Sequence, residues 1–259
     1  MATFLFDEII FGPVKSRRLG ISLGINLLPT DSKLCNFNCI YCECGWTPGK
    51  KEMKVSYHPR QVVAEKLEET LQNMVKNEMP LDVITYAGNG EPTMHPDFEE
   101  IIDDTIRLRD IYFPKARIAV LSNATLLHKE SVVRALKRIK DNILKLDSVF
   151  SETIELFNMP LGKYNITKVI EQLKSFNGDL IIQTMFVRGT YNGKAVDNTT
   201  EKELSAWINA LHEIKPKQVM IYTIARDTPS PDLIKVPIED LNKIKERLEK
   251  EGFKVQVSG

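Results

Sequence analysis

Apolar runs and runs of helical period alternate along almost the whole chain. Runs that are rich in Val, Ile and Tyr and nearly all apolar are typical of strands buried on both faces. The expected strands are Ile21–Leu28, Leu81–Tyr86, Ala116–Leu121, Asn142–Leu146, Asp179–Val187, Gln218–Ile224 and Phe253–Val257. The expected helices are Pro59–Val75, Asp97–Arg109, Lys129–Ile139, Asn165–Ser175, Glu201–Ile214 and Ile238–Glu251.

This alternation predicts βαβ units and a parallel sheet, either doubly wound or closed into an open barrel. We expect one domain over residues 1–259, with an N-terminal extension at 1–20, a core at 21–237 and a last helix and strand at 238–259. In both architectures ligands bind at the carboxyl ends of the strands. The loops that follow the strands are therefore where chemistry is expected.

Composition and charge narrow the class of protein. The 259 residues are 42% hydrophobic and 27% charged, and 35 Lys and Arg balance 35 Asp and Glu. A balanced charge disfavours a broad contact with nucleic acid. The small basic clusters, Lys15 with Arg17 and Arg18, and Lys50 with Lys51 and Lys54, are interpreted first as solvated surface. With no secretory signal and no membrane-length apolar run, we expect a cytoplasmic protein that contacts neither a membrane nor DNA.

Cysteine is scarce but concentrated, because all four cysteines lie within ten positions. Cys35, Cys39 and Cys42 have the spacing C-x3-C-x2-C, and Cys44 follows. A disulfide framework would spread its cysteines along the chain, so this cluster predicts a metal site. Thiolates suit zinc or an iron–sulfur cluster. A zinc site and an electron-transfer cluster with Cys44 as fourth ligand remain alternatives, but we favour a three-cysteine cluster with one open iron.

Polar residues follow the next two predicted strands. The segment Gly88-Asn89-Gly90-Glu91-Pro92 has small residues that let the backbone approach a ligand and a carboxylate that can receive an ammonium group. Ser122 and Asn123, after the third strand, can bind a ribose or a carboxylate. The alternative for the first segment is a capped turn that leads into a helix, which we favour less, and the alternative for the second is a simple loop turn, which is equally well supported.

Charged residues follow the later strands. The alternation of side chains along a strand places Lys145 and Asp147 on the same side, as an ion pair beside a ligand or as a structural salt bridge. Arg226 and Asp227 either face a substrate or pair and close their loop. Before the cysteines, the paired Arg17 and Arg18 can hold anions.

These motifs together resemble the radical S-adenosylmethionine (radical SAM) superfamily. The Cys35–Cys39–Cys42 spacing, with Tyr41 before the last cysteine, is similar to its cluster loop, and Gly90-Glu91-Pro92 is similar to its Gly-Gly-Glu motif. The resemblance implies an α/β open partial (βα)6 barrel with parallel strands and a C-terminal extra strand. Cys35, Cys39 and Cys42 would bind three irons of a 4Fe–4S cluster, and the fourth iron would bind S-adenosylmethionine. The implied cofactor-binding residues are Tyr41, Gly88, Asn89, Gly90, Glu91, Ser122, Asn123 and Asp147, and the catalytic candidates are Lys145, Asp147 and Arg226.

The resemblance also implies a reaction. One electron from flavodoxin or ferredoxin would cleave S-adenosylmethionine and give a 5′-deoxyadenosyl radical, which takes a hydrogen atom from the substrate. The segment Phe11–Gly20, together with Gly90-Glu91-Pro92 and Lys145-Leu146-Asp147, resembles the branch that includes tRNA wyosine-base synthases, which implies a modified nucleobase as the substrate. RNA, a peptide and a small metabolite remain open as substrates. The alternatives are an activating enzyme that installs a glycyl radical on a partner protein and an electron-transfer module without turnover. We expect Cys44 to remain unligated, because a fourth cysteine ligand would leave no iron for S-adenosylmethionine.

Overall fold

The computed structural model describes residues 4–16, 18–49 and 55–259. Its main sheet has eight strands in the order β1-β2-β3-β4-β5-β6-β9-β11. Every neighbouring pair in this sheet is parallel except β1 and β2. The strands are β1 (Ile10–Ser16), β2 (Gly20–Ile25), β3 (Val83–Tyr86), β4 (Arg117–Ser122), β5 (Asp141–Lys145), β6 (Ile181–Met185), β9 (Gln218–Tyr222) and β11 (Val255–Ser258).

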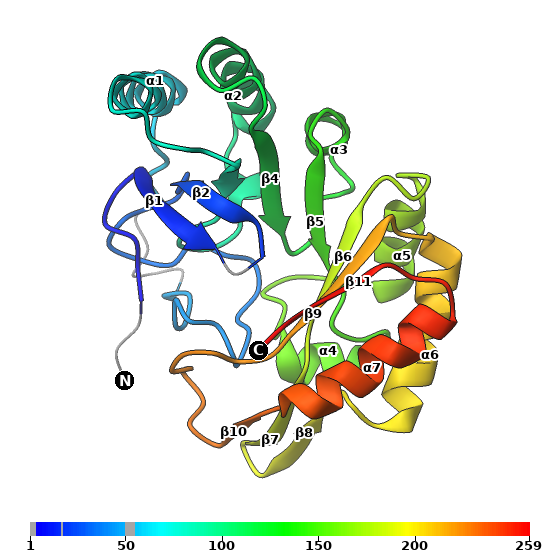
Figure 1. The fold of residues 1–259 in the computed structure, drawn as a ribbon. Coiled ribbons are helices and arrows are strands. Elements are labelled where there is room, and N and C mark those ends of the chain that lie inside the picture. The colour runs from blue at the N-terminus through cyan, green and yellow to red at the C-terminus, as the bar shows by residue number, and fades with distance from the viewer. Residues whose placement is uncertain (1–3, 17, 50–54) are drawn as a thin grey trace.

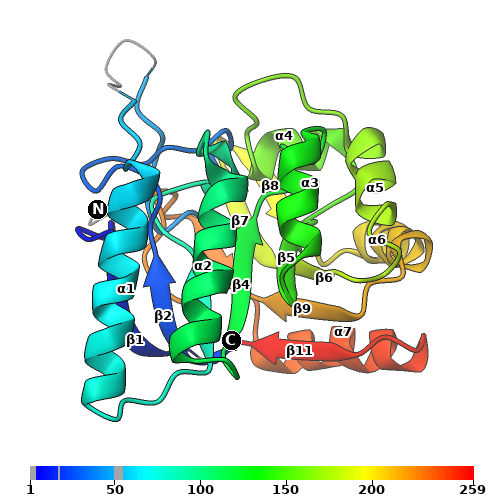
Figure 2. The same cartoon turned by 90° about the horizontal axis from the view of Figure 1, so that it is seen from above.

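The helices lie on the outer face of this curled sheet (Figure 1), and in Figure 2 helices α1, α2 and α3 stand in front of the strands. Helix α1 shows why, because its buried residues Val63, Leu67, Leu71 and Met74 form one apolar stripe. The helices are α1 (Arg60–Lys76), α2 (Phe98–Tyr112), α3 (Glu130–Lys137), α4 (Ser151–Phe157), α5 (Ile166–Lys174), α6 (Glu201–Ile214) and α7 (Ile238–Lys250), with a short 3-10 helix at Pro92–Met94. None of the helices in the described ranges is long and apolar enough to cross a membrane.

This architecture confirms the expected α/β class and the partial parallel barrel. Each expected strand has its counterpart, and β11 is the extra C-terminal strand, parallel to β9. Within the expected N-terminal extension, the strand β1 was not predicted, and it joins the sheet antiparallel to β2. Gly12 and Pro13 lie where the β1–β2 register shifts.

A second, three-stranded sheet was not predicted. It has the order β10-β7-β8, with β7 (Val187–Tyr191), β8 (Lys194–Asp197) and β10 (Leu233–Lys235). The expected strand Asp179–Val187 divides at Phe186, and the chain leaves the barrel there into the β7–β8 hairpin. An apolar run alone does not reveal this change of partner, because both strands are apolar at the junction.

The floor of the barrel interior is apolar. Leu19, in the turn between β1 and β2, packs with one residue from each of five strands: Val83, Ala119, Ile143, Ile181 and Met220. Since side chains alternate along a strand, the residue two positions further on points to the same side. On β4, β5, β6 and β9 these residues are Leu121, Lys145, Gln183 and Tyr222, and all four line the cavity above the floor.

Candidate functional site

The cysteines lie in the long connection between β2 and α1, which is fixed to the loop after β3. Leu34 donates its N–H to the carbonyl of Asn89 at 2.8 Å, and the N–H of Glu91 donates to the carbonyl of Leu34 at 3.1 Å. Gly90 between them has φ +138°, and a Cβ at this position would lie 1.8 Å from the Leu34 oxygen. Glycine is therefore required here because the cysteine loop approaches this backbone closely.

A cavity of about 280 Å³ at the carboxyl ends of the strands brings together most of the predicted site. The predicted residues that line it are Cys35, Cys39, Tyr41, Cys42, Gly88, Gly90, Glu91, Ser122, Asn123 and Lys145. Cys44 lines it too, and its thiol donates to the carbonyl of Gly88 at 3.5 Å. Segments that are far apart in the sequence thus converge on one site, as expected for the carboxyl edge of a parallel barrel.

All four cysteines are free thiols, and their surroundings differ. Burial raises the pKa of Cys35 to about 12 and also raises the pKa of Cys39. A hydrogen bond from Cys44 lowers the pKa of Cys42 to about 5, although burial opposes this shift. The same contact raises the pKa of Cys44. The contact therefore shifts the two thiol pKa values in opposite directions and makes Cys42 the more acidic thiol of the pair.

Lys33 is a buried cation that interacts electrostatically with Cys35, Cys39 and Cys42. It is only 2% exposed, and its Nζ donates to the carbonyl of Gly45 at 2.9 Å. Burial lowers its pKa, but the charges of Cys42, Cys35 and Cys39 outweigh burial, so the pKa is raised. Sequence analysis missed Lys33, because a lysine two residues before a cysteine carries no distinctive spacing.

The donor set fits an iron–sulfur cluster. Three thiols face one cavity, and N–H groups approach two of the sulfurs: Asn123 Nδ2 lies 3.6 Å from Cys35 Sγ, and Asn158 Nδ2 lies 3.5 Å from Cys39 Sγ. Hydrogen bonds to sulfur are among the contacts that tune such clusters. In the described part of the chain, no three His, Cys, Asp or Glu side chains are grouped to hold a single metal ion. A cubane binds each thiolate to a different iron, so it does not need such a group.

Glu91 is the centre of a buried network in the cavity wall. It is 2% exposed, and its carboxylate accepts from the Thr93 N–H at 3.1 Å, the Thr93 hydroxyl at 2.5 Å and the Ser122 hydroxyl at 2.9 Å. Its other oxygen accepts from the Asn123 N–H at 2.6 Å. Burial raises the pKa of Glu91, and these hydrogen bonds oppose the rise. The network holds the ends of β3 and β4 together.

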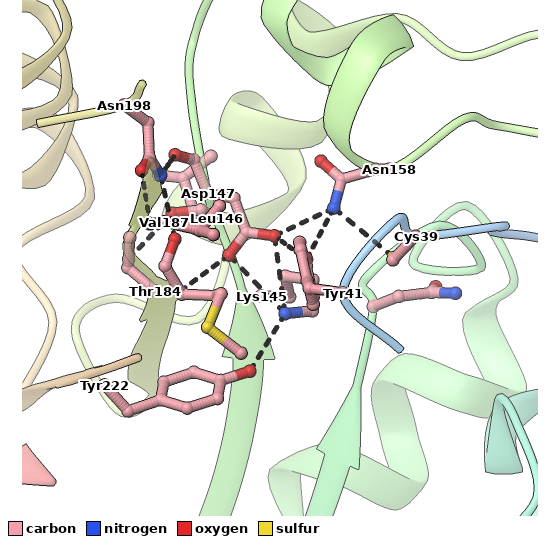
Figure 3. Close-up of polar contacts among 12 residues, drawn as sticks. Cys39, Tyr41, Lys145, Leu146, Asp147, Asn158, Thr184, Val187, Asn198 and Tyr222 are labelled. Carbon is pink, nitrogen blue, oxygen red and sulfur yellow. Dashed lines mark hydrogen bonds and ion pairs between the residues drawn. The ribbon is translucent and has the colours of Figure 1, made fainter. Parts of the chain in front are cut away.

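Asp147 organises a second network, which Figure 3 shows around its carboxylate. It accepts hydrogen bonds from the Tyr41 hydroxyl, from Asn158 Nδ2 at 2.8 Å and from the N–H of Met185 at 2.9 Å. Lys145 Nζ lies 3.4 Å from it and 3.3 Å from the Tyr222 hydroxyl. Burial lowers the pKa of Lys145, but Asp147 and Tyr222 raise it by more, so Lys145 is held as a cation.

The structure places three predicted residues outside the cavity wall. Asn89 is fully buried, and its side chain contacts the backbone of Phe6 and Pro29. The Asp147 side chain is 0% exposed and does not line the cavity itself, but it contacts the lining residues Tyr41, Lys145 and Met185. Arg226 has a side chain that is 59% exposed and pairs with Glu43 at 2.8 Å, so it closes its loop against the cysteine segment.

Several cavity residues were not among the site candidates from the sequence, and Gln183, Tyr222 and Arg18 are three polar ones beside Lys33. Gln183 and Tyr222 occupy the positions on β6 and β9 that match Lys145 on β5, so strand alternation carried through the whole sheet would have found them. Arg18 comes from the turn between β1 and β2. It belongs to a pair noted as a possible anion contact, and its partner Arg17 lies outside the described residues.

Comparisons with known proteins identify relatives of this chain and structures that share its fold. A UPF0026 protein of Helicobacter pylori strain J99 is 32% identical over 234 residues, which are 88% of this chain and 69% of that protein. GTPase Obg of Brachyspira hyodysenteriae is 30% identical over 93% of this chain, but the match spans only 33% of that protein. The crystal structure of Streptococcus suis SuiB bound to S-adenosylmethionine has the same fold, with TM-score 0.64, 17% identity, and coverage of 91% of this chain and 50% of SuiB.

A family match covers the cysteine loop and most of the barrel. Residues 31–202 match the family described as the Radical SAM superfamily. This range contains the three spaced cysteines, the Glu91 network and the Lys145–Asp147 pair, and it is more than half of the chain. The chain therefore belongs to the radical SAM superfamily.

Proposed function

We propose that this protein is an enzyme that cleaves S-adenosylmethionine reductively and uses the resulting radical to abstract a hydrogen atom from a substrate. The observation that carries the proposal is the single cavity that is lined by Cys35, Cys39 and Cys42 together with Gly88, Gly90 and Glu91. When bound, a reduced 4Fe–4S cluster supplies the electron that splits the sulfonium into methionine and a 5′-deoxyadenosyl radical. Flavodoxin or ferredoxin is the proposed electron donor.

In this proposal the chain's own residues bind the cluster and S-adenosylmethionine, orient the side chains around them and exclude water. The three thiolates hold the cluster, and Cys44 stays protonated beside them. Glu91, with one oxygen that accepts only a single hydrogen bond, receives the ammonium of S-adenosylmethionine. Ser122 and Asn123 supply further polar contacts, and Asp147 positions Tyr41 and Lys145 without contacting the cofactor itself. The apolar floor of the barrel prevents water from entering the cavity from that side.

Anaerobic reconstitution tests the proposal directly. The expected product is a brown protein with about four irons and four sulfides per chain. With dithionite it should convert S-adenosylmethionine to methionine and 5′-deoxyadenosine. Cys39→Ala should lose the cluster and the cleavage while its melting temperature in the cluster-free state stays close to that of the wild type. Full-occupancy zinc without iron uptake would refute the proposal, and an intact cluster that binds no S-adenosylmethionine would favour an electron carrier.

A further inference from the structure

Two buried nitrogen atoms in the cavity wall have no hydrogen-bond partner: Arg18 Nη1 and Gln183 Nε2. Gln183 is 5% exposed, so its amide cannot turn to bulk water. Leaving a buried donor unpaired is unfavourable, and native proteins hold few such groups. The other two unpaired atoms in the described residues belong to Asn26 and Asn142, which do not line this cavity. Because Arg18 and Gln183 line the same cavity, their two unpaired donors indicate an acceptor group of a ligand.

Arg18 is held in place by its surroundings. Ser16 Oγ accepts from the N–H groups of Arg18 at 3.3 Å and Leu19 at 3.2 Å, which closes the turn between β1 and β2. Gln256, on the last strand, donates to the carbonyl of Arg18 at 3.0 Å, and Arg117 donates to that of Leu19 at 2.8 Å. The guanidinium lies 4.8 Å from the centre of the Tyr222 ring. This turn is therefore built to present Arg18 in the cavity.

Arg18 differs from the other cations at the site because part of its guanidinium has no partner. Lys145 is paired with Asp147, Arg226 is paired with Glu43, and Lys33 faces the cysteines. Arg18 Nη1, by contrast, contacts no carboxylate of the described residues. A guanidinium is charged at all physiological pH values and matches carboxylate and phosphate geometry. The missing acceptor is therefore an anion.

The position of a second cavity indicates which ligand carries that anionic group. This cavity has about 350 Å³ and shares Arg18, Glu43, Ala87 and Leu121 with the first cavity, and the shared carboxylate of Glu43 is paired with Arg226. Its other wall carries phenyl rings, among them Phe6 and Phe11, which stack at 3.7 Å between centroids. Arg18 thus stands where the cluster cavity meets an aromatic chamber. The cysteines and the Glu91 network line only the first cavity, which separates the chamber from the proposed S-adenosylmethionine site.

We infer that Arg18 and Gln183 form the anion-binding subsite for the substrate, which carries a carboxylate or phosphate group and an apolar, planar part that occupies the aromatic chamber. The acceptor oxygens of the anion take the hydrogen bonds from Arg18 Nη1 and Gln183 Nε2. The substrate would then span the two cavities, with the position that loses hydrogen directed at the cluster end. This inference rests on the proposed function.

Small anions test the subsite without the natural substrate. The reconstituted protein, saturated with S-adenosylmethionine, is titrated with inorganic phosphate, acetate, phenyl phosphate and benzoate while its melting temperature is followed. One of the two anion classes should raise the melting temperature saturably, which identifies phosphate or carboxylate as the group. Its phenyl derivative should half-saturate at a lower concentration than the inorganic phosphate or acetate. Arg18→Gln and Gln183→Leu should each raise the half-saturating concentration about tenfold or more, the effect of losing a charge-assisted hydrogen bond.

Controls separate this inference from the proposed function. Arg107→Gln, which removes an arginine whose side chain is 55% exposed on α2, should leave every titration unchanged. Iron content and S-adenosylmethionine affinity should be the same in all variants. Equal titrations in the wild type and both subsite variants would overturn the inference, as would a tenfold loss of S-adenosylmethionine affinity in Arg18→Gln. The titrations are repeated on cluster-free protein, so a failure of the cluster chemistry refutes the proposed function while the subsite is still decided.

Discussion

Gly90→Ala tests how the cysteine loop is positioned. A methyl group at residue 90 would lie 1.8 Å from the carbonyl oxygen of Leu34, about 1.2 Å inside the 3.0 Å below which real Cβ contacts essentially do not occur. That oxygen belongs to backbone, so no side-chain rotation relieves the contact. The backbone segments around Leu34 and Gly90 must separate, and the two hydrogen bonds that Leu34 makes on either side of Gly90 must break.

The expected loss of stability has two parts. Each of the two backbone hydrogen bonds contributes about 1 kcal/mol net. An alanine at φ +138° adds roughly 1–2 kcal/mol of backbone strain. The total of about 3–4 kcal/mol corresponds to a fall in melting temperature of roughly 10 °C for a domain of this size. Because Cys35 follows Leu34 directly, we also expect less than half of the wild-type iron after reconstitution.

Two other glycines provide matched controls. Gly193→Ala meets no atom within 4 Å at φ +73°, so it carries the backbone strain alone. Gly162→Ala also meets no atom and has no such φ, so it should be silent. Melting temperature and iron per chain are measured for all three variants. If Gly90→Ala melts within about 2 °C of Gly193→Ala and binds a full complement of iron, then the contact with Leu34 does not position the cysteine loop.

Three further changes probe other parts of the site. Glu91→Gln should weaken S-adenosylmethionine binding by tens-fold in equilibrium dialysis at unchanged iron content, because it removes one partner of a buried charge pair; exposed Glu130→Gln is the control. Cys44→Ser should keep its iron and still cleave S-adenosylmethionine with dithionite, and loss of the cluster would make Cys44 a ligand. Burial lowers the pKa of His95, so the unfolded chain binds more protons and stability falls as pH drops below about 6.5. His95→Asn should flatten the dependence of melting temperature on pH between 7 and 5, and an equally steep curve would contradict this.

Much of the fold could be predicted from one-dimensional pattern. The strands β2, β3, β4, β5, β6 and β9 are largely buried on both faces, so their apolar runs are unambiguous, whereas the edge strand β11 is half-buried throughout. The small sheet of β7, β8 and β10 escaped detection because its strands are short and partly exposed, and because β10 pairs with a strand more than forty positions earlier. Pairing over such a separation depends on contacts that local pattern does not contain.

The sequence by itself determined the chemistry of the cluster loop. Three cysteines at close, fixed spacing define their own local geometry, since the loop that holds them is short. The segment Gly88–Glu91 and the pair Lys145–Asp147 could be placed at strand ends for the same reason, because each lies within a few residues of an apolar run. These are properties of neighbouring residues, which the linear order preserves.

The tertiary structure alone decided which polar side chains face the cavity. Asp147 and Asn89 lie in the segments that sequence selected, yet their side chains are used up in buried contacts behind the wall. Arg18 reaches the cavity only because the turn between β1 and β2 folds under the barrel and is held there by Gln256, 238 residues later. The direction of a side chain depends on packing between elements that are distant in sequence, and hydrophobic burial fixes that packing only when the whole sheet has closed.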